Sequence, residues 1–208
     1  MILVITTSEI NLQQHISLKN TKKIKSVGEL DLTISNSVSL KDEVISFKSK
    51  GSKTELLVGL KWVKNNFDIS SIIFFDYIEP INMNLLVNHI IIPLRLFSID
   101  DPPLEWSNNP LINKIEINTL INKKIRKIIY DTNFDFFYGD ILSIDKKFIN
   151  TQVVDELRDL NNFDGLNHLI FTSNKFANEN NIEIYNLCIC KTNPMVNLKF
   201  NMLLEKLF

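Results

Sequence analysis

Apolar and polar positions alternate along this chain with two different periods, as they do in an α/β protein. Short runs of β-branched and aromatic residues are bounded by polar turns, and longer stretches repeat apolar residues at helical spacing. The short runs predict strands at 2–6, 30–35, 44–47, 71–78, 90–96, 134–142 and 182–190. The helical spacing predicts one helix that begins near 52 or 54 and ends at 67, and others at 111–129, 151–160, 166–177 and 197–208. We therefore expect an α/β fold, a single three-layer domain over 1–208 in which helices flank a central twisted mixed sheet.

Some of these segments carry more specific signals. The run at 71–78 is apolar from Ile72 to Phe75, which favours a central parallel strand covered on both faces. Pro93 marks a bulge or a sheet edge in the strand at 90–96, because proline has no N–H for the ladder. The proline-rich segment 100–109 is the clearest loop, and its Trp106 either anchors the loop or covers a pocket.

The composition is that of a globular protein without a dominant charge. Of the 208 residues, 45 % are hydrophobic and 23 % are charged, and the net charge is −1, which excludes global disorder. This balance gives no overall field that attracts phosphate backbones or anionic lipid, so we expect no nucleic-acid partner and no membrane partner. The apolar stretch 85–97 is too interrupted to span a membrane, and the apolar start at 1–5 lacks the basic region of a signal peptide. We expect a cytoplasmic protein.

The cysteines and histidines do not form a metal-binding pattern. Cys188 and Cys190 alternate on a predicted strand, so their side chains share one face and are expected to be core thiols. His15, His89 and His168 are widely separated, and none has another histidine or a cysteine at the spacing of metal ligands. We therefore expect no metal and no cofactor.

Three segments follow the predicted strands in a recognisable order. Ser-Lys-Gly-Ser-Lys at 49–53 ends a strand and precedes an amphipathic helix, GDILSIDKKFIN occupies 139–150, and Lys-Thr-Asn-Pro at 191–194 follows the last strand. In order and spacing they resemble segments of the nucleoside phosphorylase superfamily, above all its methylthioadenosine and S-adenosylhomocysteine nucleosidase branch. The resemblance covers 1–193 and implies a nucleoside phosphorylase-like fold.

The resemblance also implies where a ligand would bind. Phe148 stands where the family stacks an aromatic ring on the base, and Asp145 is a carboxylate near the same pocket. Asp145 could bind the ligand or cap the helix that follows. Ser49 and Lys53 could hold a phosphate or a ribose, or Lys53 could be a solvated lysine at a capped helix start.

The departures from the family fall at its acidic positions. The acid after the first strand corresponds to Leu12, the ribose-binding carboxylate to Ile170, and the acid that protonates the purine to Asn193, which follows Thr192 in the last turn. An amide can hydrogen-bond to a ring nitrogen but cannot supply the proton, a contribution of about 10²- to 10⁴-fold in rate. Large side chains at 75–80 also replace the family's glycine-rich turn. The family reaction is therefore expected to be slow or absent.

Three interpretations of function stay open. In the first, the chain is a pseudoenzyme that binds a purine nucleoside or a protein partner. In the second, it is an active purine nucleosidase or phosphorylase that cleaves the N-glycosidic bond with displaced acids, Glu9, Asp145 or Asp164. In the third, it is a structural subunit of a homo-oligomer such as a dimer, or of a hetero-oligomer with a related subunit, and side chains such as Tyr77 and Phe171 fill the pocket.

Overall fold

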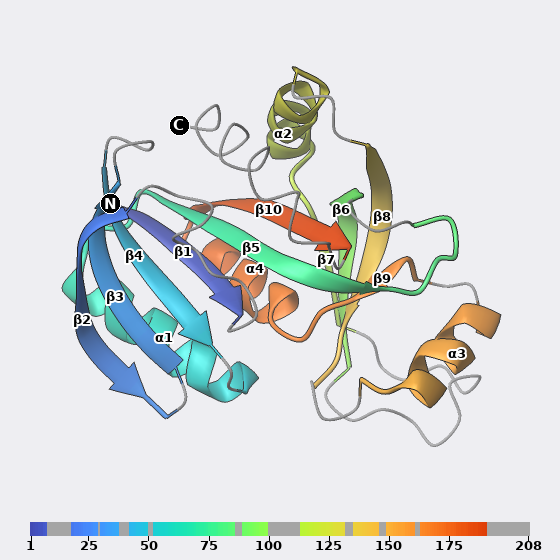
Figure 1. Cartoon of the computed structure of the whole chain (residues 1–208), viewed down its shortest axis with the longest axis horizontal. Helices are drawn as coiled ribbons and strands as arrows, with labels where there is room; N and C mark the ends of the chain where they lie inside the picture. Colours follow the sequence, from blue (N-terminus) through green and yellow to red (C-terminus); the bar gives the residue numbers. More distant parts are fainter. Residues whose placement is uncertain are drawn as a thin grey trace.

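The computed structural model describes residues 1–7, 18–28, 30–37, 42–49, 52–85, 89–99, 113–131, 135–145, 149–160 and 163–190. Figure 1 shows these elements in chain order from blue to red. They are β1 (Ile2–Thr7), β2 (Leu18–Val27), β3 (Leu30–Ser37), β4 (Asp42–Ser49), α1 (Lys53–Asn66), β5 (Ser71–Pro80), β6 (Ile90–Ser98), β7 (Asn113–Glu116), α2 (Thr119–Asp131), β8 (Phe136–Ser143), α3 (Thr151–Leu160), β9 (Gly165–Leu166), α4 (Ile170–Glu179) and β10 (Glu183–Cys190).

The strands of the described chain form one mixed sheet, part of which closes on itself. β1 lies between β4 and β5, parallel to both, and β3 and β2 extend this side as an antiparallel meander. On the other side of β5, β10 pairs with β5 and β6, β6 pairs with β8, β8 with β9, and β9 with β5 again. These five strands make a closed ring, and the short β9 completes it (Figure 1).

Helices cover both faces of the sheet, as the alternation of side chains along β1 illustrates. Leu3 and Ile5 pack in one apolar cluster with residues of α1 and α4. Ile2 and Val4 point to the opposite face and pack in a second cluster with residues of α2. α3 packs separately, in a third cluster with residues around the end of β8 and β9. The three-layer α/β prediction with a central mixed sheet is confirmed.

Most of the predicted elements are present, with ends shifted by a few residues. α1 begins where the sequence predicts because Ser52 and Glu55 form a capping box. Oγ of Ser52 accepts a hydrogen bond from the Glu55 N–H (3.3 Å), and Oε2 of Glu55 accepts one from the Ser52 N–H (3.1 Å). In β6 the register with β8 shifts between Pro93 and Arg95, so the bulge interpretation of Pro93 is confirmed.

Two predicted helices begin later than expected. Residues 111–129 do not form one helix, because Asn113–Glu116 is the strand β7 on the edge of β6 and α2 begins at Thr119. Ile115 and Ile117 alternate with polar residues, and Oδ1 of Asn118 then accepts from the Leu120 N–H (2.9 Å) at the start of α2. The helix predicted from 166 begins at Ile170, since Gly165–Leu166 is the strand β9.

β2 was not predicted, because it carries the pattern of a solvated edge rather than of a buried strand. Its exposed lysines are Lys19, Lys22, Lys23 and Lys25. Lysine on an edge strand opposes pairing with another chain, so polar composition and strand structure are compatible here. Cys188 and Cys190 are buried free thiols on one face of β10, as predicted. The loop at 100–109 with Trp106 and the helix at 197–208 lie outside the described residues.

Candidate functional site

Lys53 joins the start of α1 to the ends of β6 and β8. Ser98 and Ser143 are register partners at these two strand ends. Nζ of Lys53 donates to Oγ of Ser98 (3.2 Å) and to the backbone oxygens of Ile99 (3.5 Å) and Ser143 (3.3 Å). Lys53 is therefore a half-buried lysine with a fixed ammonium group, and the solvated-lysine interpretation is wrong.

The backbone of Ser49 lies at the same end of the parallel strands. Ser49 is the last residue of β4 and is the register partner of Thr7, the last residue of β1. Because Lys53 begins α1 four positions later, the two predicted residues lie at the end of β4 and at the start of α1. In open α/β sheets, ligands bind outside the carboxyl ends of the strands, and the assignment of Ser49 and Lys53 to a ligand stays a prediction.

Asp145 lies two residues beyond the end of β8 and is half-buried. It does not cap α3, because Asn150 holds that position. Oδ1 of Asn150 accepts from the Val153 N–H (3.0 Å), and its backbone oxygen accepts from the Val154 N–H (3.0 Å). The capping interpretation of Asp145 is therefore wrong, and its interpretation as a ligand-binding carboxylate stays a prediction.

Ile170 is the first residue of α4 and is fully buried. The polar group at this helix start comes instead from Asn167. Oδ1 of Asn167 accepts from the N–H groups of Leu169 (2.8 Å) and Ile170 (2.9 Å), which satisfies two of the donors that a helix leaves open at its N-terminus. At the position that the resemblance gives to the ribose carboxylate, the protein therefore has a buried aliphatic side chain.

The segment 75–80, where the family has a glycine-rich turn, is a continuous part of strand β5. It pairs with β10 as far as Ile78 and with β9 at Glu79 and Pro80. Ile78 is fully buried. Gly165 of β9 approaches it so closely that an added Cβ would lie 2.3 Å from Cγ2 of Ile78, which requires glycine there. The segment is therefore a paired strand, and the expectation that its side chains would crowd a ligand stays a prediction.

A buried carboxylate that the sequence analysis did not select lies in the same strand. Asp76 is 1 % exposed, and its Oδ2 accepts a hydrogen bond from Nδ2 of Asn167 (2.8 Å), which also donates to the Tyr77 backbone oxygen (2.9 Å). Asp76 faces its register partner Cys188 on β10. Burial raises the pKa of the Cys188 thiol, and the charges of Asp76 and Cys190 raise it further. Asp76 could have been selected from the sequence, because it interrupts the apolar run of β5.

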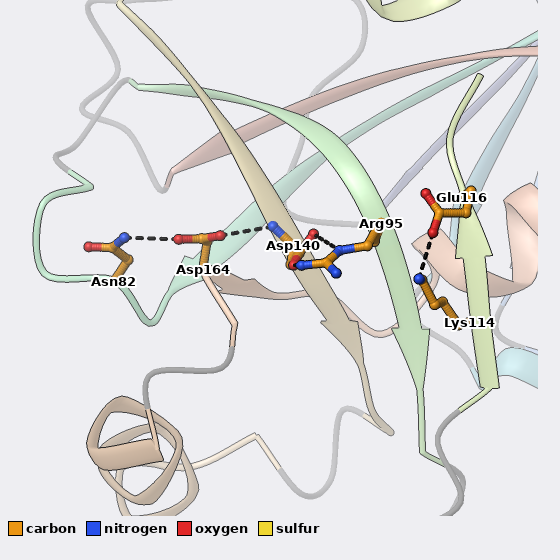
Figure 2. Close-up of polar contacts among 6 residues, drawn as sticks. All are labelled: Asn82, Arg95, Lys114, Glu116, Asp140 and Asp164. Atoms are coloured by element: carbon orange, nitrogen blue, oxygen red, sulfur yellow. Dashed lines mark hydrogen bonds and ion pairs between the residues drawn. The ribbon is translucent and has the colours of Figure 1, made fainter. Parts of the chain in front are cut away.

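Asp164, one of the displaced acids of the second interpretation, is held inside a polar network (Figure 2). Its Oδ1 accepts from Nδ2 of Asn82 (2.8 Å), and its Oδ2 accepts from the Asp140 N–H (2.8 Å). The Asp140 carboxylate in turn accepts from the guanidinium of Arg95, and this hydrogen bond raises the Arg95 pKa. An added Cβ at Gly139 would lie 3.0 Å from the Asp164 side chain. Asp164 therefore stabilises the junction of β5, β8 and β9.

Several predicted positions cannot be placed in this geometry. Leu12, Phe148, Thr192 and Asn193 lie outside the described residues, as does Glu9. Within the described ranges, no three His, Cys, Asp or Glu residues gather as a metal site would require. No helix in those ranges is both long and apolar enough to cross a membrane.

Comparison with known proteins gives matches in structure alone. No family model and none of the curated proteins matches this chain. A futalosine hydrolase mutant of Helicobacter pylori has a TM-score of 0.74 at 13 % identity, over 100 % of this chain and 96 % of that one. A Helicobacter pylori nucleosidase mutant with 5′-methylthioadenosine in its active site has a TM-score of 0.75 at 16 % identity, over 99 % and 91 %.

A further solved structure extends this similarity to another organism. The 5′-methylthioadenosine/S-adenosylhomocysteine nucleosidase of Neisseria meningitidis, in complex with methylthio-immucillin-A, has a TM-score of 0.68 at 12 % identity. The match covers 99 % of this chain and 92 % of that one. At such identities the likeness shows the fold alone, which this chain shares with the futalosine hydrolase and the two nucleosidases.

Proposed function

We propose that this chain, which has the fold of the nucleosidases, binds a purine nucleoside and cleaves it slowly or not at all. The proposal rests mainly on the side chains at the start of α4. Ile170, which corresponds to the family's ribose-binding carboxylate, is fully buried, and the amide of Asn167 occupies the helix start. Without that carboxylate, the sugar loses a charged hydrogen-bond partner that orients it for reaction.

The described acids in this part of the fold do not replace the lost group. Asp76 is buried and bonded to Asn167, and both carboxylate oxygens of Asp164 accept hydrogen bonds inside the protein. Asp145, beyond the end of β8, is the described carboxylate that we assign to ligand binding. An asparagine at 193 would remove a further contribution of about 10²- to 10⁴-fold in rate, since an amide cannot act as the general acid.

A second candidate, a subunit of an oligomer, is favoured by apolar side chains on the surface near α2 and β8. Leu120 and Tyr130 of α2 are 70 % and 75 % exposed, and Phe137 and Tyr138 of β8 are 38 % and 40 % exposed. Aromatic side chains are enriched at protein interfaces. In this candidate the partner is a second copy of the chain, as in a dimer, or a related subunit.

Nucleoside binding and base release, measured on the same samples, test the proposal. Thermal unfolding is followed with adenine, methylthioadenosine, S-adenosylhomocysteine and inosine, and released base is quantified by chromatography. A ligand at about 100 times its Kd adds roughly 2.7 kcal/mol of stability, which corresponds to a rise in Tm of about 5 to 10 °C. Such a shift without base release is the expected result.

The variant Asp145→Ala separates this proposal from the alternatives. We expect it to weaken the nucleoside-induced shift, whereas Asp159→Ala, at an exposed aspartate of α3, leaves the shift unchanged. Base release that Asp145→Ala abolishes would instead support an active nucleosidase or phosphorylase. Neither shift nor release with any of the four compounds would favour the oligomer subunit, and sedimentation velocity would then measure its assembly.

A further inference from the structure

A cavity of about 400 Å³ lies between α1, α4 and the pair β6 and β7. Its lining includes Lys53 and Lys61 of α1 and Lys175 and Glu179 of α4. Asp145 and Ile170, which belong to the nucleoside site proposed above, do not line it. We propose that this cavity binds a small molecule that carries a phosphate monoester. The inference rests on the cavity and is independent of the proposed function.

The charge of the lining favours an anion. Among the lining residues that the structure describes, three lysines and one glutamate give a local formal charge of three minus one, or +2, in a chain whose net charge is −1. Lys61 and Lys175 are exposed and form no ion pair or hydrogen bond with any residue that the structure describes. A concave surface lined by one sign of charge concentrates ions of the opposite sign, so this attraction is local to the cavity.

Lys53 contributes positive charge to the cavity, but its N–H groups already donate to other residues. Its Nζ already donates to Ser98, Ile99 and Ser143, and an ammonium group has three N–H donors. These three acceptors are a hydroxyl and two backbone oxygens. The ammonium is held in place beside the cavity, and its positive potential acts on the ligand at no further cost in side-chain entropy.

The first turns of two helices also line the cavity. Thr54 belongs to the first turn of α1, and Thr172 belongs to the first turn of α4. Threonine hydroxyls donate readily to phosphate oxygens. Two hydroxyls and three lysines therefore supply hydrogen-bond donors or positive charge to the same volume.

The volume and the apolar lining indicate an ester rather than a free anion. Ligand pockets have volumes of about 300 to 1,000 Å³, and inorganic phosphate would leave most of this cavity empty. Leu57, Phe171 and Phe176 line it as well, and both phenylalanines are buried. An apolar or aromatic body can pack there while the phosphate contacts the lysines. Phenyl phosphate has both parts and is the probe that we choose.

Calorimetric titration with phenyl phosphate at constant ionic strength tests the proposal. We expect saturable binding that is weaker for inorganic phosphate and undetectable for phenol. The double variant Lys61→Gln with Lys175→Gln is expected to weaken binding by about tenfold or more, because it removes two charge-assisted hydrogen bonds to the phosphate. Its control, Lys123→Gln with Lys127→Gln, makes the same change in charge at exposed positions of α2.

Glu179→Gln gives a test of opposite sign. Glu179 is the carboxylate of the lining and is exposed, so its removal is expected to strengthen binding of phenyl phosphate about threefold. Circular dichroism checks that each variant is folded. If the double variant does not fold, the titration of Glu179→Gln is the test of the proposal.

Three results would overturn the proposal. One is the lack of saturable binding by the wild-type protein at millimolar phenyl phosphate. The second is an equal loss of affinity in the α2 control, and the third is unchanged or weakened binding in Glu179→Gln. Inosine binding by the double variant distinguishes this site from the nucleoside site. We expect the double variant to bind inosine with the same affinity as the wild-type protein.

Discussion

Nδ2 of Asn167 donates a hydrogen bond of 2.8 Å to the carboxylate of Asp76, across 91 positions of sequence. Oδ1 of the same asparagine accepts from the first N–H groups of α4. One amide therefore joins the centre of β5 to the start of the helix on which the family would place its ribose carboxylate. Both side chains are at most 3 % exposed, so this link is part of the core.

Asn167→Ala is expected to destabilise the protein by about 2 to 4 kcal/mol. The substitution removes the acceptor of the Leu169 and Ile170 N–H groups, worth about 1 kcal/mol, and a buried hydrogen bond to a carboxylate, worth about 1.5 to 3 kcal/mol. Urea denaturation measures the change in the free energy of unfolding. Asn178→Ala, at an exposed position of α4, is the control and should lie within about 0.5 kcal/mol of the wild-type protein. Equal stabilities of the two variants would show that the link contributes nothing.

The sequence predicted the parts of the fold in which local pattern and burial agree. β5 was found because its apolar run is covered on both faces, and α1 because Ser52 and Glu55 form a local capping box. β7 was taken for helix because it directly precedes the helical pattern of α2, although Ile115 and Ile117 alternate as in a strand, and its pairing with β6 makes it a strand. Polar β2 becomes a strand because it pairs with β3, which its composition does not reveal.

The candidate site was predicted in part, for a similar reason. Lys53 and Asp145 follow strand ends, so their neighbourhood could be inferred from the order of the elements. Their contacts could not, because the partners of Lys53 lie 45 to 90 positions away. Asp76 interrupts an apolar run and could have been selected, whereas Asn167 has an ordinary local setting, and it is the folded chain that brings the two together.

Asn174 of α4 and Asn186 of β10 form a reciprocal pair whose strength a double-mutant cycle can measure. Each Nδ2 donates to the other side chain's Oδ1, at 2.9 and 3.0 Å, and both residues are 1 % exposed. Each single substitution to alanine leaves a buried amide without this partner and should cost about 1 to 3 kcal/mol. The double variant should cost less than the sum, with a coupling of about 1 kcal/mol or more. If the losses of stability in the two single variants simply added up in the double variant, the two side chains would not interact.

The thiol of Cys190 is expected to react slowly and to make stability depend on pH above neutrality. Burial, followed by the charge of Glu79, raises its pKa from 9.0 to about 11. At pH 8 the folded protein then has about a hundredfold less thiolate than an unperturbed cysteine, so alkylation by iodoacetamide should be slower by at least that factor in Cys188→Ala. Alkylation of the same variant in urea is the reference, and equal rates in the two states would disprove the expectation.

The sign of the stability effect follows from the raised pKa of Cys190. The folded state keeps the proton that the unfolded state loses above pH 9, so this contribution is fully present below pH 9 and is lost as the pH rises through about 11. Urea denaturation between pH 8 and about 11 should therefore give a smaller decline for Cys190→Ala than for the wild-type protein. Parallel declines would mean that the thiol does not contribute.

Ile170→Glu restores the family's acidic residue in sequence but is expected to destabilise the protein and to leave it inactive. The side chain of Ile170 is 0 % exposed in the cluster beneath α4, so a glutamate there would bury an unpaired charge. A cost above about 3 kcal/mol follows, whereas Ile170→Val should cost about 0.5 to 1.5 kcal/mol. Urea denaturation and chromatographic detection of base from methylthioadenosine measure the two effects. A stable Ile170→Glu protein that releases base would mean that the nucleosidase site is intact apart from one residue, and the proposed loss of function at α4 would be wrong.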